Sequence, residues 1–340
     1  MSTGMTQLAA SPDVVPPDPS KHVNYTLGML LGVDDFNQEF AYLSGRDQWM
    51  ARDLAGYGTI CGLKVSLDQS AKGPRLSVSS GTALSPRGQM ICLHPDQCAY
   101  LNDWLTANQA DAVKHLLAGS PPDSLLKLWL VVCYRDCPVD PVPIAGEPCR
   151  SADDLMANSR RVDDFRLELR FAPPQQQEEE AIRDFVNWLD QIQITTTGPF
   201  LKLNEFEDNL RAAFMPIASP VDAETFFHLG SPLNNIHVHP NDIGTYLRSA
   251  FRIWATEIRP IFHSCWPNQS CGCSGGASPK APIDDECLLL AELDVPVVNV
   301  GPGWQADDKH SIVIDESHRP ILLHTRMLQE WMQSGLRGGK

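Results

Sequence analysis

The sequence predicts an α+β protein in which an N-terminal helix plus an antiparallel β unit precedes a helix-rich second domain with a few strands. Three observations lead to this prediction. Residues 23–67 combine helical spacing of apolar residues with a glycine turn and a run of strand formers. Short apolar segments separated by turns follow, and amphipathic helical segments begin after a break in composition near residue 173. A chain of 340 residues more often builds two medium cores than one large core.

The stretch from Val23 to Leu67 predicts one long amphipathic helix that runs through a glycine turn into a strand. Asp34 and Asp35 stand where a helix N-cap and a first-turn acid belong, and Gly56 stands where a left-handed residue can end the helix. Apolar residues recur at helical spacing, which places on one helical face Phe36, Phe40, Leu43, Met50 and Leu54. We find no heptad run long enough to predict a coiled coil.

The predicted first domain spans residues 21–172 and follows a proline-rich extended arm at residues 1–20. Short strands are expected between residues 63 and 100, followed by a helix at 101–119. The continuous apolar run at 124–136 predicts a buried strand, and its partner is the alternating segment 163–171. The proline-rich connection 136–160 predicts a long irregular binding loop.

A linker at residues 173–180 and a helix-rich domain at residues 181–334 follow, and a flexible tail at 335–340 ends the chain. The predicted helices of this domain are 178–192, 203–214, 240–262 and a last helix opened by Pro320. Two strands are predicted at 286–300 and 310–316, and between helices and strands lies a cysteine-rich loop at 263–287.

The cysteine-rich loop offers a candidate metal site. Four thiolates in a short segment could bind zinc tetrahedrally or hold an iron–sulfur cluster, and the candidate ligands are Cys265, Cys271, Cys273 and Cys287. Their spacing is not that of two C-x2-C pairs, so disulfides and buried free thiols stay open as alternatives. Cys287 begins an apolar strand and could equally belong to the core.

A second group of cysteines lies around the predicted 136–160 loop. Cys137 and Cys149 both fall within this loop and form a candidate disulfide. Cys133 lies inside the apolar strand, where a cysteine usually packs as a small hydrophobic residue.

Charge and motif content disfavour several classes of function. A net charge of −15, from 42 acidic and 27 basic residues, disfavours nucleic acid as a partner and disfavours anionic membrane surfaces. No apolar run approaches the roughly 20 residues of a membrane helix, so no membrane insertion is expected. The N-terminus lacks the features of a secretory signal, which predicts a cytoplasmic site of assembly. Nucleophile-elbow, zinc-protease and P-loop motifs are absent, so we expect no enzyme activity.

Two sequence patterns carry a resemblance to a known family. They are N-Y-x-x-G-x-L-L-x-x-x-D-F at 24–36 and G-x-G-x-x-C-G-L-x-V at 56–65. The matching residues are Asn24, Tyr25, Gly28, Leu30, Leu31, Asp35, Phe36, Tyr42, Arg52, Gly56, Gly58, Cys61, Gly62, Leu63 and Val65. Further similar segments lie at 81–93, 129–143 and 318–331. The chain thereby resembles a bacterial and phage family encoded among genes for contractile phage tails and contractile injection systems.

The resemblance implies a structural role in a tail or baseplate, through subunit–subunit adhesion. The implied partners are other tail or baseplate subunits, in multiple copies within a symmetric particle, so the protein would pass from the cytoplasm into a virion or injection-system particle. The residues that the resemblance marks for interaction are Asn24, Tyr25, Asp35, Phe36 and Arg52. The alternative hypothesis is a metal- or iron–sulfur-dependent redox enzyme centred on the Cys265–Cys287 cluster.

Overall fold

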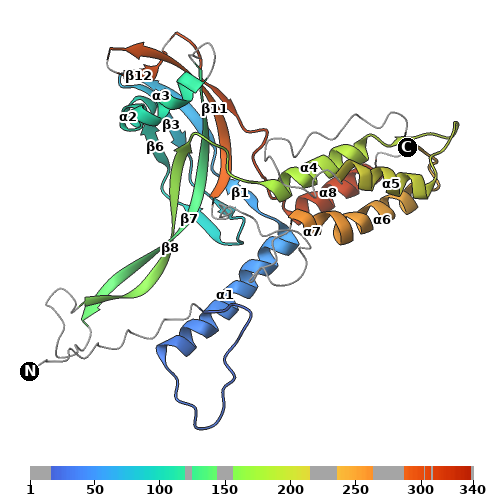
Figure 1. The fold of residues 1–340 in the computed structure, drawn as a ribbon, viewed down its shortest axis with the longest axis horizontal. Helices are drawn as coiled ribbons and strands as arrows, with labels where there is room; N and C mark the ends of the chain where they lie inside the picture. Colours follow the sequence, from blue (N-terminus) through green and yellow to red (C-terminus); the bar gives the residue numbers. More distant parts are fainter. Residues whose placement is uncertain are drawn as a thin grey trace, which may run out of the picture.

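The computed structural model describes residues 17–118, 125–143, 156–214, 236–262, 287–301, 303–307 and 309–337. Within these ranges the chain forms a β-rich part, a helical part and two long projections, one a helix and one a β-hairpin (Figure 1). The predicted α+β class is confirmed. The first projection is α1, at Val33–Ala55, which leads through Gly56 into strand β1 as predicted.

Antiparallel sheets build the β-rich part. The first small sheet has the strand order β1-β4-β5, and its strands are β1 Gly58–Gly62, β4 Gly81–Leu84 and β5 Met90–Leu93. The second has the order β2-β3-β6, with β2 Val65–Ser70, β3 Gly73–Val78 and β6 Gln97–Tyr100. The largest sheet has the order β12-β11-β7-β8, with β7 Leu125–Pro143, β8 Met156–Arg170, β11 Cys287–Val300 and β12 Gly303–Ala306, and β13 Val313–Asp315 pairs with β11.

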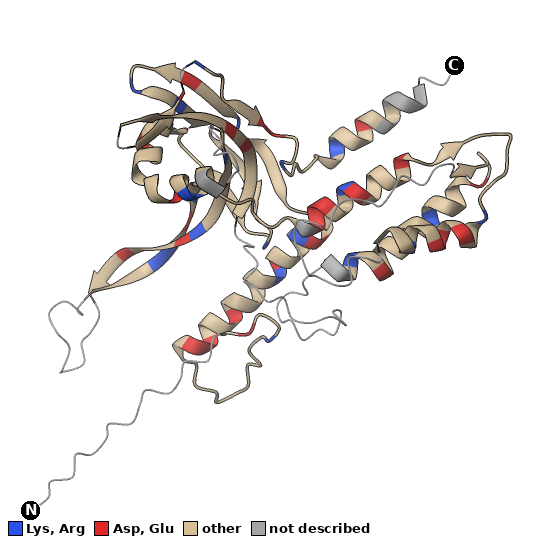
Figure 2. Ribbon diagram, turned by 45° about the horizontal axis from the view of Figure 1, so that its top comes forward, with Lys and Arg blue, Asp and Glu red and all other residues tan. Residues whose placement is uncertain are grey.

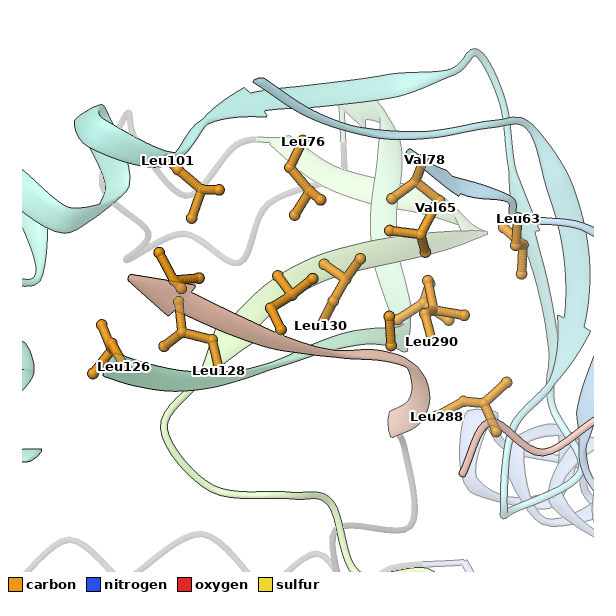
Figure 3. Close-up of a cluster of buried hydrophobic side chains, with 14 of the residues drawn as sticks. Leu63, Val65, Leu76, Val78, Leu101, Leu126, Leu128, Leu130, Leu288 and Leu290 are labelled. Atoms are coloured by element: carbon orange, nitrogen blue, oxygen red, sulfur yellow. The ribbon is translucent and has the colours of Figure 1, made fainter. Parts of the chain in front are cut away.

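The first hydrophobic core lies between these sheets (Figure 3). Leu63 and Val65 on one side face Leu128 and Leu290 on the other, and all four are buried. Burying such a side chain stabilises the fold by about 1.5–3 kcal/mol. Two helices, α2 Leu101–Ala107 and α3 Gln109–Ala118, pack at one end of this part (Figure 1). They replace the single helix predicted at 101–119 because Asn108 caps both of them, donating to Trp104 and accepting from Asp111 and Ala112.

The last strands return to the first core, which corrects the predicted domain division. β11 pairs antiparallel with β7, with Cys287 opposite Cys133 and Val295 opposite Leu126. The two strands predicted for the C-terminal unit, at 286–300 and 310–316, therefore belong to the sheet of the N-terminal unit. The physical reason is that β11 is buried almost continuously from Cys287 to Ala291, and such a run needs neighbouring strands and cover on both faces.

The helical part is inserted between β8 and β11. It contains the three predicted helical segments, now resolved as α4 Gln177–Asp190, α5 Leu203–Phe214, α6 Ile243–Ile253, the π-helical turn η3 Trp254–Ile258 and α7 Arg259–Phe262. Two short strands, β9 Gln193–Ile194 and β10 His237–Val238, pair in parallel beside them. A second core of aromatic and aliphatic side chains, including Trp188, Phe206 and Leu210, holds these helices together.

The second projection is the distal half of β7 and β8, which corrects the predicted irregular loop at 136–160. The two strands stay paired from Trp129 opposite Arg170 as far as Pro143 opposite Met156. Beyond Cys133, β11 no longer accompanies β7, so one side of the ribbon carries no ladder within the described residues. Proline is tolerated at such an unpaired edge because no ladder hydrogen bond needs its missing N–H.

The final helix, α8, spans Thr325–Arg337 and begins later than predicted. The residues before it form a bridge with β1 instead of a first helical turn, since Ile321 pairs in parallel with Thr59. No helix among the described residues has the length and apolar content needed to cross a lipid bilayer.

Candidate functional site

The apolar face of α1 is turned to solvent. Of its predicted face residues, Phe36 is 61% exposed, Phe40 is 72% exposed and Leu54 is 85% exposed. Leu43 and Met50 are exposed as well, and the preceding segment adds Tyr25 and Leu30. Solvent-exposed apolar side chains that form one continuous surface usually mark an interaction site. The surface formed by α1 and residues 25–32 is therefore the candidate functional site.

The preceding chain segment lies along α1 beside its apolar face. The Asp18 N–H donates to Gln38 Oε1 at 2.9 Å, and Gln38 Nε2 donates back to the Asp18 carbonyl at 2.6 Å. The Val23 N–H donates to Glu39 Oε2 at 2.9 Å. The His22 ring lies against Tyr42 with 5.0 Å between the ring centroids. These contacts tie residues 18–23 to one side of the helix and leave the apolar side uncovered.

Farther along, the same side of α1 packs on the body of the protein. Gly45 is buried, and Gly88 in the β4–β5 turn lies directly against the Gln48 carbonyl. Near the end of the helix, Arg52 forms an ion pair with Glu178 of α4 at 3.6 Å, and both side chains are largely buried. Arg259 of α7 joins them, with its Nε 2.9 Å from Glu178 Oε1. The helix is thus anchored to the helical part through charged groups.

The five residues marked for interaction divide into two groups. Asn24, Tyr25 and Phe36 are exposed and available to a partner, so their interaction role stays a prediction. Asp35 has a partner within the chain, since its Oδ2 accepts the N–H of the N-cap residue Gly32 at 2.8 Å at the start of α1. Arg52 points inward to Glu178, so its observed partner is within the chain.

The glycine pattern after α1 forms a tight junction with the C-terminal segment. A Cβ on Gly58 would lie 2.9 Å from the backbone carbonyl of Pro320, so only glycine fits there. The Thr59 N–H donates to the Pro320 carbonyl at 2.9 Å, and the Leu322 N–H donates to the Thr59 carbonyl at 2.9 Å. Two segments that carry the sequence resemblance, 56–65 and 318–331, therefore meet in space, although no local pattern in the sequence predicts this pairing.

Arg319 is a buried cation at the centre of this junction. Its Nε donates to Thr59 Oγ1 at 2.9 Å, its Nη2 donates to the Gly62 carbonyl at 3.4 Å, and its Nη1 pairs with Glu316 at 2.7 Å. Arg183 of α4 donates to the Arg319 carbonyl at 2.9 Å, which links the junction to the helical part. These arginine contacts fix the base of α1 relative to both cores.

The first turn of α4 carries two glutamates, Glu179 and Glu180, whose ionised forms are disfavoured by partial burial. Burial raises the pKa of the Glu180 carboxyl, and the charge of His318 opposes this while that of Asp184 adds to it. A raised pKa in the folded state means that the ionised carboxylate destabilises the fold at neutral pH. This penalty is fully present above the folded-state pKa and disappears as the pH falls through the ordinary range of glutamate.

Replacing Glu180 with glutamine is therefore expected to raise the free energy of unfolding near pH 7, with a gain that shrinks as the solution is acidified toward about pH 4. Urea unfolding at the two pH values measures the effect. Glu205→Gln is the control, because Glu205 is a first-turn acid of α5 that is exposed. A loss of stability in the Glu180 variant at pH 7 would contradict the expectation.

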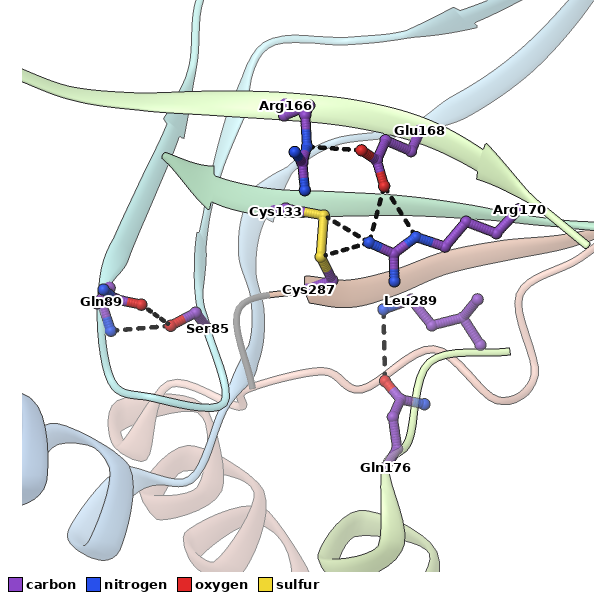
Figure 4. Close-up of a disulfide and its surroundings, with 9 residues drawn as sticks. All are labelled: Ser85, Gln89, Cys133, Arg166, Glu168, Arg170, Gln176, Cys287 and Leu289. Carbon is purple, nitrogen blue, oxygen red and sulfur yellow. Dashed lines mark hydrogen bonds and ion pairs between the residues drawn. A yellow bond between two sulfur atoms is a disulfide. The ribbon is translucent and has the colours of Figure 1, made fainter. Parts of the chain in front are cut away.

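The structure pairs Cys133 with Cys287 in a disulfide between β7 and β11 (Figure 4). Both residues are fully buried, and their Cα atoms lie 4.0 Å apart at directly opposed positions of the two strands. Arg170 Nη2 donates to Cys287 Sγ at 3.0 Å and also contacts Glu168, which pairs in turn with Arg166 (Figure 4). A row of charged side chains on β8 therefore covers the disulfide.

This disulfide changes the two cysteine hypotheses. In this arrangement the Cys287 sulfur is bonded to Cys133 and is not a free thiolate for the proposed metal or cluster. The other three candidate ligands, Cys265, Cys271 and Cys273, lie outside the described residues, and so does Cys149. Cys137, the other cysteine of the candidate Cys137–Cys149 disulfide, is a free thiol. Its Sγ accepts a hydrogen bond from Arg135 Nε at 2.8 Å.

Metal-ligating atoms do approach each other at the disulfide. The Cys133 and Cys287 sulfurs and a Glu168 carboxylate oxygen lie within 4.8 Å of one another. The two sulfurs are joined, and Glu168 is neutralised by Arg166 and Arg170. Because metal binding needs thiolates and an available carboxylate, this group is explained as a disulfide with a charged cover.

Reduction of this disulfide is expected to lower the free energy of unfolding by about 2–4 kcal/mol, since the cross-link restrains a long loop of the unfolded chain. The measurement is thermal unfolding with and without reductant. The control is the double variant Cys133→Ala/Cys287→Ala, whose unfolding temperature should not respond to reductant. Complete alkylation of both cysteines in unreduced, denatured protein would contradict the pairing.

Comparisons with known proteins give structural neighbours only. No family model matches the sequence, and no curated protein matches it. Among solved structures, the chain is similar to one described as "Crystal structure of TssK", at 12% identity and a TM-score of 0.26, over 78% of this chain and 66% of that one. A second is the TssK-TssF-TssG baseplate subcomplex of the type VI secretion system, at 12% identity and a TM-score of 0.24, over 78% of this chain and 93% of that one. TM-scores below 0.5 do not establish a common fold, so the function below is derived from this chain's own surfaces.

Proposed function

We propose that this protein is a structural, non-enzymatic subunit of a contractile phage tail or contractile injection system, placed in the baseplate and acting by adhesion between subunits. The observation that carries the proposal is the solvent-exposed apolar face of α1, which the fold holds rigidly by its opposite side. The sequence resemblance supports it, because the matched residues build this feature. The partners would be neighbouring subunits of the same particle.

The matched residues serve the adhesive surface in two ways. Some of them hold α1 in position, as Arg52 does with Glu178 and as Gly58 does against Pro320. Others, among them Tyr25 and Phe36, lie on the surface itself. Removing apolar surface from water contributes about 25 cal/mol per Å², and a pre-positioned helix loses less conformational entropy on binding than a flexible one. An apolar helix that is held in position on its other side is therefore suited to contacts between subunits.

The β7–β8 hairpin offers a second surface for the same role. Figures 1 and 2 both show it projecting to the same side of the molecule as the free end of α1. Its arms are held by cross-strand ion pairs, such as Arg161 with Asp136 at 2.6 Å and Arg160 with Asp140 at 2.9 Å. We propose that α1 and the β7–β8 hairpin both contact the same neighbouring subunit.

Sedimentation of a native lysate followed by mass spectrometry of the particulate fraction tests the proposal. We expect this chain to sediment with contractile sheath and tube proteins. Recovery only at the top of the gradient, as a small species, would overturn the structural role. The same gradient tests the alternative of a metal- or iron–sulfur-dependent redox enzyme, which would be a small species carrying stoichiometric zinc or iron.

A further inference from the structure

The exposed residues of α1 follow a seven-residue repeat. Their spacing alternates between three and four residues, and the members, here called the α1 seam, are Val33, Phe36, Phe40, Leu43, Asp47, Met50 and Leu54. This is the a/d pattern of a coiled coil, and it continues for about three heptads. Three heptads are at the short limit for predicting a coiled coil from sequence, so the exposure of these residues in the structure, rather than the spacing alone, supports a partner. Every member of the α1 seam is exposed, so the fold leaves the whole seam without a partner in the described part of the chain.

The contacts that anchor α1 recur with the same period on the opposite side. Gln38 binds the Asp18 backbone, Gly45 is buried, and Arg52 pairs with Glu178. These three residues are seven apart and occupy the f position, which points directly away from the a/d seam. The apolar spacing and these anchoring contacts therefore both indicate that the a/d side of α1 is the side available to a partner.

The length and composition of the α1 seam point to one occupant. A seam of this length needs a partner helix of similar length, and α1 has 23 residues. The only other long helical stretch among the described residues, the continuous α6–η3–α7 from Ile243 to Phe262, is committed to the second core through Ile253 and Ile258. We propose that the α1 seam packs against the α1 seam of a second copy of this chain, in a short coiled coil. This deepens the proposed function, because it rests on adhesion through α1 and names the partner for that surface.

The available area is sufficient for such a contact. The six apolar side chains of the α1 seam are between 44% and 85% exposed and together leave roughly 700–800 Å² accessible, close to the roughly 800 Å² that one partner contributes to a standard interface. The flanking e positions, Asn37, Ser44 and Ala51, are small and uncharged. On this flank a second helix meets no charged side chain, whereas the g flank carries Glu39, Arg46 and Asp53. Glu39 there accepts the Val23 N–H and Asp53 pairs with Arg259, so both acids already have partners within the chain.

Asp47 is the one polar member of the α1 seam. A single polar residue at an a position weakens a coiled coil and restricts its register and number of strands. The seam is therefore built for a limited, specific association. Removing the charge should strengthen the association whichever way the two helices run, because Asp47 would lose its solvation at the contact.

Analytical ultracentrifugation of the full chain over a range of concentrations tests the inference. The wild type should self-associate, and Phe40→Glu should raise the dissociation constant about 30-fold or more, as expected for a central interface residue. Asp47→Leu should lower the dissociation constant about tenfold or more. The matched control is Trp49→Glu, because Trp49 is an exposed apolar residue of the same helix that lies outside the α1 seam. Circular dichroism confirms that each variant is folded.

Two results would overturn the inference. One is a monomer at every concentration for both the wild type and Asp47→Leu. The other is an equal weakening by Phe40→Glu and Trp49→Glu, which would mean that any charge on α1 has the same effect. The sedimentation of lysate separates this inference from the proposed function: a monomeric chain that still enters sheath-containing particles contradicts only the self-association. A self-associating chain that never enters such particles contradicts the baseplate role instead.

Discussion

Replacing Gly62 with alanine is expected to lower the free energy of unfolding by about 3 kcal/mol or more. Gly62 has a φ of 67°, which already strains a residue with a Cβ. An added Cβ would overlap the Ser80 carbonyl oxygen and lie 2.8 Å from Gly81 Cα. These neighbours belong to the backbone around β4, where Gly81 pairs with Gly62, so they cannot move without breaking the β1–β4 ladder. Equilibrium unfolding in urea measures the loss.

Gly28→Ala is the matched control for this prediction. Gly28 also has a positive φ, 86°, but no atom lies within 4 Å of the position of its Cβ. Only the backbone strain should appear, which is about 1–2 kcal/mol. If the two variants lost equal stability, the close packing at the β1–β4 junction would not be the reason that glycine stands at position 62.

Replacing Arg319 with methionine is expected to cost about 3–5 kcal/mol of folding free energy. Methionine fills much of the space but provides no donor to Thr59 Oγ1, to the Gly62 carbonyl or to Glu316. Arg319 is only 7% exposed, so water does not readily replace these contacts. Removal of one partner from a buried charged network leaves the others desolvated and unpaired. The same urea titration measures this loss.

An exposed arginine provides the comparison for Arg319. Arg326 pairs with Glu330 one turn farther along α8, and both side chains are 58% exposed. Such surface pairs contribute about 0.3–0.5 kcal/mol, so Arg326→Met should have almost no effect. A similarly small effect of Arg319→Met would show that the junction between β1 and the C-terminal segment is not held by that guanidinium.

The sequence predicts most of the local structure correctly because its periodicity is strong. The long helix, the short antiparallel strands and the amphipathic helices after residue 173 each have an unambiguous apolar pattern. The domain division could not be predicted in the same way. β11 completes a sheet with β7, and no local signal indicates which distant strand a continuous apolar segment will join. The hairpin was missed because its prolines predict an irregular loop, whereas they occupy an isolated ribbon.

The helix that carries the candidate site could be predicted from the sequence, but the exposure of its apolar face could not. The family-like pattern includes residues of the exposed helix α1, but two of them, Asp35 and Arg52, make contacts within the chain. Amphipathic spacing alone cannot tell whether a helical face is buried in the same chain or left for another. The disulfide of Cys287 with Cys133 was also beyond local inference, because the two residues are 154 positions apart.

The insertion of the helical part between β8 and β11 has a consequence for biosynthesis. β7 emerges from the ribosome long before β11, its neighbour in the largest sheet, since the paired residues Cys133 and Cys287 are separated by 154 positions. At typical synthesis rates of about 5–20 residues per second, the edge of β7 that later pairs with β11 stays unpaired for on the order of ten seconds. The helical part depends on contacts closer in sequence and can fold during this interval. The nascent chain is thus expected to need protection by chaperones at this edge, until translation passes β13 at Val313–Asp315 and the first core closes.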